Sequence, residues 1–161
     1  MTDNGRKNLI ASTTAAVLIF GGLLVSAVLA AAAPEKEYGS IFVDEVVSVY
    51  DGDTFTVNVR QWPQILGDHI GIRLNGVDTP EMKGSTPEVK AAAEKAKTLV
   101  EKMLTKSRFV VLKHIKRDKY FRVVADVECD GKDLGKALID AGLAKPYDGG
   151  TKDQWANEDV D

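Results

Sequence analysis

Alternating apolar and polar side chains divide the middle of the chain into short segments. From Thr54 to Arg60 every second residue is apolar, and the same period of two runs from Ile70 to Val77. This period is typical of strands that bury one face. A looser alternation over Ile41–Tyr50 predicts an earlier strand, and residues 109–115 and 123–127 are rich in β-branched side chains. The pattern therefore predicts five strands.

One long stretch instead follows the helical period. Ser85-Thr86-Pro87-Glu88 predicts a helix start, in which Ser85 caps, Pro87 occupies the first turn and Glu88 completes a capping box. We expect the helix to run from about Pro87 to Lys106, because apolar residues recur there at spacings of three and four. The apolar stripe consists of Val89, Ala92, Ala93, Ala96, Leu99, Val100 and Met103.

A second and shorter helix is predicted after the last strand. Asp133 is placed to cap it, and the helix should reach about Ala141 before Gly142 ends it. Three strands, a helix, two strands and a helix form the order of a five-stranded OB-fold barrel. The expected fold class is therefore mainly β with α, a barrel with two packed helices.

An apolar leader helix is expected to precede the barrel. Residues 9–33 carry no charge, and Arg6 and Lys7 stand before them. As a helix this run would span roughly 37 Å, enough to cross a bilayer. The basic start and the small residues at its end equally fit a cleaved signal peptide. Both interpretations place the domain outside the cytoplasm, secreted or periplasmic, and a retained leader would anchor it. A buried globular helix is the less favoured alternative, because the run is not amphipathic.

The remaining chain is expected to hold one globular domain. A chain of 161 residues is long enough for one domain with a substantial core and short for two. We expect the leader at 1–33, a linker at 34–40, the domain at 41–148 and a flexible tail at 149–161. The chain is expected to be a monomer with no protein partner.

Charge and composition restrict the chemistry. Beyond the leader the chain has 23 acidic and 19 basic residues, a net charge of −4. Proteins that hold nucleic acid by overall charge are basic, so a polyanion here must be held by local arginines and a bound cation. One cysteine excludes an internal disulfide, and two histidines are too few for a histidine metal cluster. A metal would therefore be bound by oxygen, which favours calcium, magnesium or manganese.

Carboxylates gather where the predicted strands end. Asp51 and Asp53 precede one strand, and Asp78 and Glu81 follow the next. If these strands pair antiparallel through a turn around Gly67, Asp53 and Asp78 become neighbours. Two close carboxylates repel each other unless a cation lies between them. The pattern predicts a metal site, with the alternative that the aspartates only close a turn.

Three motifs, in this order, resemble the staphylococcal nuclease (thermonuclease) family. They are Asp51-Gly52-Asp53-Thr54, the stretch Arg73-Leu74-Asn75-Gly76-Val77-Asp78-Thr79-Pro80-Glu81, and Asp118-Lys119-Tyr120-Phe121-Arg122. The resemblance spans about Val43 to Tyr147. It implies an OB-fold barrel and a calcium-dependent phosphodiesterase that acts on DNA and RNA.

The resemblance also implies a metal centre and a general base. Calcium would be held by the carboxylates of Asp53 and Asp78 and by the main-chain carbonyl of Thr79. Asp51 would lie near the metal and act through water, and Glu81 would be the general base. These assignments suit the chemistry, because a phosphodiester is an anion that repels nucleophiles until its charge is neutralised.

Substrate contacts are implied in the same way. Arg73 and Arg122 would contact the scissile phosphate and stabilise charge in the transition state. Lys119 and Tyr120 would lie near the terminal phosphate of the nucleotide, and Tyr147 beside the bound base. The expected products are 3′-phosphate and 5′-hydroxyl ends.

The chain also departs from the staphylococcal enzyme. Phe121 stands in place of a glycine beside Arg122, where it is expected to tilt that arginine or narrow the pocket. The long C-terminal helix of that enzyme is expected to be absent, because the chain stops soon after Tyr147. Two other functions stay open: a non-catalytic OB-fold module that binds nucleic acid or oligosaccharide, and a scaffold that uses calcium only for stability.

Overall fold

The computed structural model describes residues 36–83, 86–150, 155–156 and 159. The predicted leader at 1–33 lies outside the described residues, so its helix, its cleavage and its role as an anchor stay predictions. Across the described part of the chain, no helix combines the length and the apolar composition needed to span a membrane.

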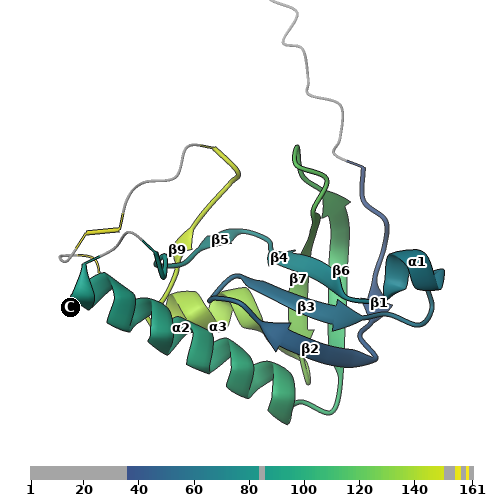
Figure 1. Cartoon of the computed structure of the whole chain (residues 1–161), viewed down its shortest axis with the longest axis horizontal. Coiled ribbons are helices and arrows are strands. Elements are labelled where there is room, and N and C mark those ends of the chain that lie inside the picture. Colours follow the sequence, from purple (N-terminus) through teal and green to yellow (C-terminus); the bar gives the residue numbers. More distant parts are fainter. Residues whose placement is uncertain (1–35, 84–85, 151–154, 157–158, 160–161) are drawn as a thin grey trace, which may run out of the picture. The chain divides into compact units, whose positions relative to one another are not determined.

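A curled sheet forms the centre of the domain (Figure 1). Its pairing order is β1-β6-β7-β4-β3-β2, with β8 attached to β7. β1 and β2 follow each other directly in the chain, so the first and last strands of this order are joined and the sheet curls into an OB-fold barrel. The predicted fold class is confirmed. The strands are β1 (Ile41–Phe42), β2 (Glu45–Val49), β3 (Thr54–Asn58), β4 (Ile70–Leu74), β6 (Val110–Arg117), β7 (Val123–Cys129) and β8 (Lys132–Asp133).

Two predicted strands are each interrupted. The predicted strand Ile41–Tyr50 is two strands, β1 and β2, which pair with different partners. The predicted strand Ile70–Val77 ends at Leu74, because Gly76 takes a φ of +75° and turns the chain. After this turn, β5 (Val77–Asp78) leaves the barrel and pairs antiparallel with β9 (Lys145–Pro146). The prediction of one continuous strand was wrong, and the break redirects Asp78.

The alternation within the strands predicted the core correctly. Phe55, Val57 and Val59 have no exposed surface, and the neighbouring strand adds Ile72 and Leu74. β3 and β4 pair antiparallel, with Thr54 opposite Arg73. β4 and β7 pair in parallel, which joins the two halves of the barrel. The polar residues of β3 and β4 therefore lie together on the face that does not enter this core.

Within the described residues, three helices accompany the barrel (Figure 1). α2 (Pro87–Lys106) has the predicted bounds, although its cap is Thr86 rather than the predicted Ser85. α3 (Leu134–Asp140) is capped by Asp133 as predicted, and Gly142 follows it in a left-handed conformation. One additional short helix, α1 (Gln64–Gly67), lies where a turn was expected. α2 packs against β2 and α3.

The turn between β2 and β3 lies directly against α2. A Cβ atom at Gly52 would lie 2.8 Å from the Cβ of Ala96 and 2.9 Å from the Cβ of Thr79. Such distances are too short for real carbon contacts, so only glycine permits this approach. Ala96, fully buried in the apolar stripe of α2, is the small residue that receives the turn. The absence of a side chain at Gly52 therefore lets the turn that carries Asp53 lie directly against Thr79 and α2.

Gly52→Ala should destabilise the fold by about 1–3 kcal/mol, because the added methyl group overpacks this contact. Gly71→Ala is the matched control, since a Cβ at that strand glycine meets nothing within 4 Å. Urea unfolding of both variants measures the difference. Equal stability of the two variants would contradict the role of Gly52.

A bulge in the β6–β7 ladder presents His114 to Asp126. The register shifts between Lys113 and Lys116, and His114 has a φ of +48°. Its Nδ1 lies 2.7 Å from Oδ2 of Asp126, whose Oδ1 accepts a hydrogen bond from Asn75. The hydrogen bond and the charge of Asp126 raise the pKa of His114 above its ordinary value of 6.5.

The stability of the protein should therefore fall as His114 loses its proton. Folding raises the pKa of this histidine, so its contribution is full below the unfolded pKa and is lost as pH rises through the folded pKa. His114→Asn keeps a residue that tolerates positive φ but cannot be protonated. Between about pH 6 and 8, the urea midpoint should fall more for the wild type than for this variant. Equal changes of the urea midpoint with pH in the two proteins would contradict the pairing of His114 with Asp126.

Candidate active site

The guanidinium of Arg73 lies between the carboxylates of Asp53 and Asp78. Its Nη1 is 2.6 Å from Oδ2 of Asp53, and its Nη2 is 3.7 Å from Oδ1 of Asp78. The three residues are only 5–6% exposed. The two aspartates thus converge on one cation, and in this structure the cation is an arginine of the chain itself. The sequence predicted that the two would be neighbours, but through the pairing of continuous strands and with a metal between them.

Backbone geometry explains how three sequence-distant groups meet. Asp53 immediately precedes Thr54, which lies opposite Arg73 in the β3–β4 ladder. The turn at Gly76 brings Val77 back toward the arginine, so that Nη2 donates a hydrogen bond of 3.0 Å to the Val77 carbonyl. Asp78 is the next residue and reaches the same guanidinium. The turn that breaks the predicted strand therefore completes the site.

Both oxygens of Asp53 are held by threonines. Oδ1 accepts a hydrogen bond from the hydroxyl of Thr54 at 3.0 Å, and Oδ2 accepts one from the hydroxyl of Thr79 at 3.2 Å. Asp51 has a different position, since its Oδ1 accepts the main-chain N–H of Asp53 at 3.0 Å and closes the turn. The threonines of the first two motifs thus orient one carboxylate.

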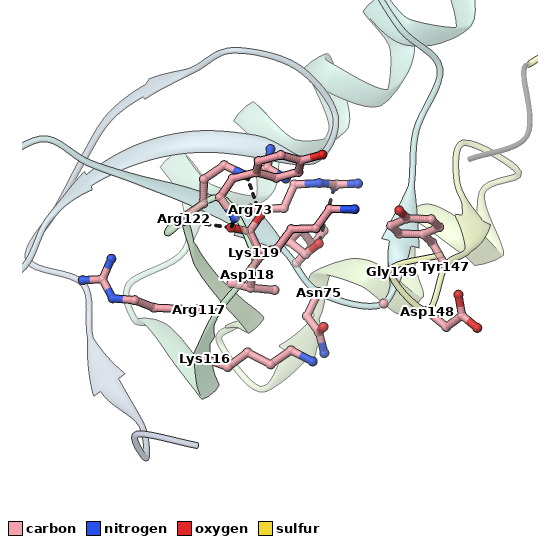
Figure 2. A pocket seen from close by; sticks show the side chains of 14 residues that line it. Arg73, Asn75, Lys116, Arg117, Asp118, Lys119, Arg122, Tyr147, Asp148 and Gly149 are labelled. Carbon is pink, nitrogen blue, oxygen red and sulfur yellow. Dashed lines mark hydrogen bonds and ion pairs between the residues drawn. The ribbon is translucent and has the colours of Figure 1, made fainter. Parts of the chain in front are cut away.

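A hollow of about 550 Å³ opens beside this ion-pair cluster (Figure 2). Tyr147 follows directly after β9, and its main-chain N–H donates to the Gly76 carbonyl at 2.9 Å. The residues predicted to contact phosphate and nucleotide all line the hollow, namely Arg73, Arg122, Lys119, Tyr120 and Tyr147.

The predicted metal ligands and general base do not line this hollow. Asp53, Asp78 and Thr79 are buried beneath Arg73, which belongs to both the ion-pair cluster and the lining. Glu81 is exposed in the loop after β5. The structure therefore brings the residues predicted to bind phosphate together around the hollow, while the predicted metal ligands Asp53, Asp78 and Thr79 are buried and Glu81 is not part of the lining.

The turn between β6 and β7 is organised by Asp118, which the sequence analysis did not single out. Its Oδ1 accepts the main-chain N–H groups of Tyr120 and Arg122, and its Oδ2 lies 2.7 Å from Nε of Arg122. Burial raises the pKa of Asp118, but the hydrogen bonds from Arg122 and Tyr120 outweigh it, and the pKa lies below the usual range. An aspartate at the start of a short turn was the available signal.

Phe121 lies on the other side of this turn. It does not line the hollow that Tyr120 and Arg122 enter, so it does not narrow that hollow as the sequence suggested. Arg122 keeps its bond to Asp118 despite the neighbouring ring.

Trp155 is a second residue that sequence reasoning missed. Its indole Nε1 donates to Oδ2 of Asp78 at 3.1 Å, and Lys145 lies over its ring at 4.6 Å. Lys145 also pairs with Asp159 at 2.6 Å. Two described residues of the segment predicted to be a flexible tail therefore contact the domain. No local pattern signals a contact between residues so far apart in sequence.

The carboxylate pair suits a hard divalent cation. Among the described residues, no three His, Cys, Asp or Glu side chains form a group that could hold a metal. Two buried carboxylates that converge on one cation do occur, and calcium accepts carboxylate and main-chain carbonyl oxygens with water completing its shell. The donor chemistry fits calcium, and a bound ion would compete with Arg73 for the same oxygens.

Arg73→Met should destabilise the protein by about 3–5 kcal/mol, because it leaves two buried carboxylates without their cation. Arg122→Met removes the other arginine–aspartate pair of the site, whose arginine side chain is 49% exposed. That control should cost less than about 1 kcal/mol. Urea unfolding in EDTA measures both.

Calcium provides a second measurement on the same variants. It should raise the unfolding midpoint of Arg73→Met more than that of the wild type, because the ion replaces the missing guanidinium. The two arginine variants could instead lose the same free energy of unfolding, and calcium could raise the midpoint of Arg73→Met no more than that of the wild type. Those results would show that the buried cluster does not depend on a cation.

Comparison with known proteins identifies the family. Residues 71–159 match the family described as staphylococcal nuclease homologue, and this match covers more than half of the chain. It includes the second and third motifs and Trp155, whereas the Asp51–Thr54 motif precedes it. A comparison with curated proteins gave no match. The resemblance inferred from the three motifs is thus confirmed, and the chain belongs to the staphylococcal nuclease homologue family.

Proposed function

We propose that the protein is a calcium-dependent phosphodiesterase that hydrolyses DNA and RNA. Membership of the family supports a nuclease or an OB-fold nucleic-acid-binding protein. The observation that carries the proposal is the position of Arg73, which lines the hollow beside Arg122 and also contacts two buried carboxylates. A phosphate held by these arginines would therefore lie close to the carboxylates proposed to hold the metal.

The two arginines would hold the scissile phosphate. Arg122 is oriented by Asp118 through its Nε, so its terminal Nη groups can donate to phosphate oxygens. Arg73 would provide a second guanidinium once it is released from Asp53 and Asp78. Charge that develops on the phosphate in the transition state would be stabilised by both groups.

Asp53, Asp78 and the main-chain carbonyl of Thr79 would hold calcium, with Asp51 acting through water. When bound, calcium would supply Lewis-acid neutralisation of the phosphate charge. The hydrogen bonds from Thr54 and Thr79 would keep the Asp53 carboxylate oriented whichever cation it holds. The two threonines would thus hold the carboxylate oxygens of Asp53 in position before calcium binds.

Glu81 would act as the general base. Its carboxylate would take a proton from the attacking water, whose oxygen would form a bond to phosphorus as the bond between phosphorus and the 5′ oxygen breaks. The leaving 5′ oxygen would take a proton from solvent water, so that a 5′-hydroxyl and a 3′-phosphate remain. Glu81 is exposed in the loop after β5, so it can exchange protons with solvent. Lys119 and Tyr120 would contact the terminal phosphate and Tyr147 the base.

The proposal includes an extracytoplasmic location. The apolar leader would direct the domain out of the cytoplasm, and residues 9–33 would anchor it to the membrane if they are retained.

Nuclease activity of the purified full chain on single-stranded DNA tests the proposal. Cleavage should require calcium and disappear in EDTA. Glu81→Gln should lower kcat at least about a hundredfold, the range typical of a general base. Glu94→Gln, an exposed glutamate on α2, is the matched control and should cleave like the wild type.

Other outcomes would favour the alternatives. Binding of DNA without cleavage at millimolar calcium would indicate a non-catalytic OB-fold module. Thermal stabilisation by calcium with neither binding nor cleavage would indicate a scaffold that uses the ion for stability.

A further inference from the structure

A second hollow of about 740 Å³ lies next to the site. The two hollows share the lining residues Lys116, Arg117 and Arg122. They are therefore adjacent, separated by the turn between β6 and β7. A polymer that placed one phosphate against Arg122 would extend from the first hollow into the second.

The turn projects an aromatic ring into each hollow. Tyr120 lines the first, and Phe121 lines the second. Both residues are exposed to solvent, and Phe121 is 77% exposed. The two rings thus line different hollows, although Tyr120 and Phe121 are consecutive residues of one turn.

Phe121 is held in an unusual backbone conformation. Its φ is +68°, a region that disfavours bulky side chains and costs on the order of 1–3 kcal/mol. The hydrogen bonds that Asp118 accepts from Tyr120 and Arg122 fix the turn around it. A large ring that is both strained and exposed contributes little to folding, which points to a contact with something outside the chain.

Arg117 supports the ring from one side. Its Nη1 donates to the Phe121 carbonyl at 2.6 Å, and its guanidinium carbon lies 5.1 Å from the ring centroid. Figure 2 shows Arg117 pointing away from Lys119 and Tyr147, and Arg117 also lines the second hollow. The ring therefore carries a cation on one face and leaves its other face for a ligand.

The rest of the lining combines aromatic and basic residues with aliphatic ones such as Ile65 and Leu66. Tyr38 is 58% exposed and is fixed by a hydrogen bond from its main-chain N–H to the Ile115 carbonyl. Lys116, Arg117 and Arg122 are basic, while Asp68 is the acidic residue of the lining. An aromatic and basic surface is what single-stranded nucleic acid requires, because bases stack on the rings and phosphates meet the cations.

We propose that this groove, named here the Phe121 groove, binds the unpaired bases that flank the scissile phosphate, with Phe121 as the stacking platform. The inference rests on the proposed nuclease function and specifies its substrate as single-stranded DNA or RNA of several nucleotides. Base pairs in a duplex keep their faces within their own stack, so a duplex does not use the platform.

Cleavage of short and long substrates by the full chain tests the groove. The ratio of kcat/KM for an octathymidylate to kcat/KM for a dithymidylate measures the benefit of flanking bases. Phe121→Gly should lower this ratio about tenfold, the loss expected for one base stack. Phe121→Trp should preserve the ratio, because the larger ring still stacks.

Phe109→Ala is the matched control. Phe109 is also an exposed ring with an arginine over it, Arg108 at 4.9 Å, and it lies before the opposite end of β6. This variant should keep the wild-type ratio. An unchanged ratio in Phe121→Gly, or an equal fall in Phe109→Ala, would overturn the groove as a subsite.

Binding separates failure of the groove from failure of the proposed function. In the Glu81→Gln background with calcium, fluorescence anisotropy should show that Phe121→Gly raises the Kd for labelled octathymidylate about tenfold. A wild type that never cleaves but shows this loss would refute the nuclease and support the groove. If Phe121→Gly instead weakens only binding to phosphatidylglycerol vesicles, the surface faces a membrane and the proposal is wrong.

Discussion

The ion pairs of Arg73 with Asp53 and Asp78 are the interaction on which the site depends. Each charge is nearly excluded from solvent, so any one of them alone would be strongly unfavourable. Their meeting requires the β3–β4 register, the turn at Gly76 and the close approach at Gly52. A buried cluster of this kind adds little net stability compared with an apolar core, but it penalises every arrangement that separates its members. It therefore acts as a constraint on how the barrel and β5 fit together.

The sequence predicted most of the fold because the strongest signals are periodic. The buried faces of β3 and α2 follow alternation and helical spacing, and both were located correctly. The break between β4 and β5 was missed, since alternation of polarity continues through Asn75 and Gly76 while the backbone turns. The Asn-Gly pair is a turn signal and was the available clue. A polarity pattern records which face a side chain takes and not whether the strand continues.

The sequence also predicted only part of the site, because local motifs identify residues but not the contacts between distant segments. The carboxylates and arginines were identified from motifs at strand ends, and the β3–β4 pairing together with the turn at Gly76 brings Asp53 and Asp78 to the same arginine. Arg73 was assigned to a polar face, yet that face is covered and the arginine is buried between the acids. Trp155 contacts Asp78 across 77 positions, a distance over which local patterns carry no information. Contacts of this kind depend on the assembled fold.

The charge of the protein determines how a nucleic acid can be held. The chain is acidic overall, with a net charge of −3, although basic residues gather locally around the two hollows. Affinity from counterion release grows with the number of phosphates neutralised, so this term is small here. Stacking does not depend on net charge and tolerates every base. An acidic protein that holds one phosphate with arginines and the flanking bases with rings would release its products readily, because no extended basic surface retains them. The two exposed rings of the β6–β7 turn would thus add stacking to the local basic residues in a chain whose net charge is negative.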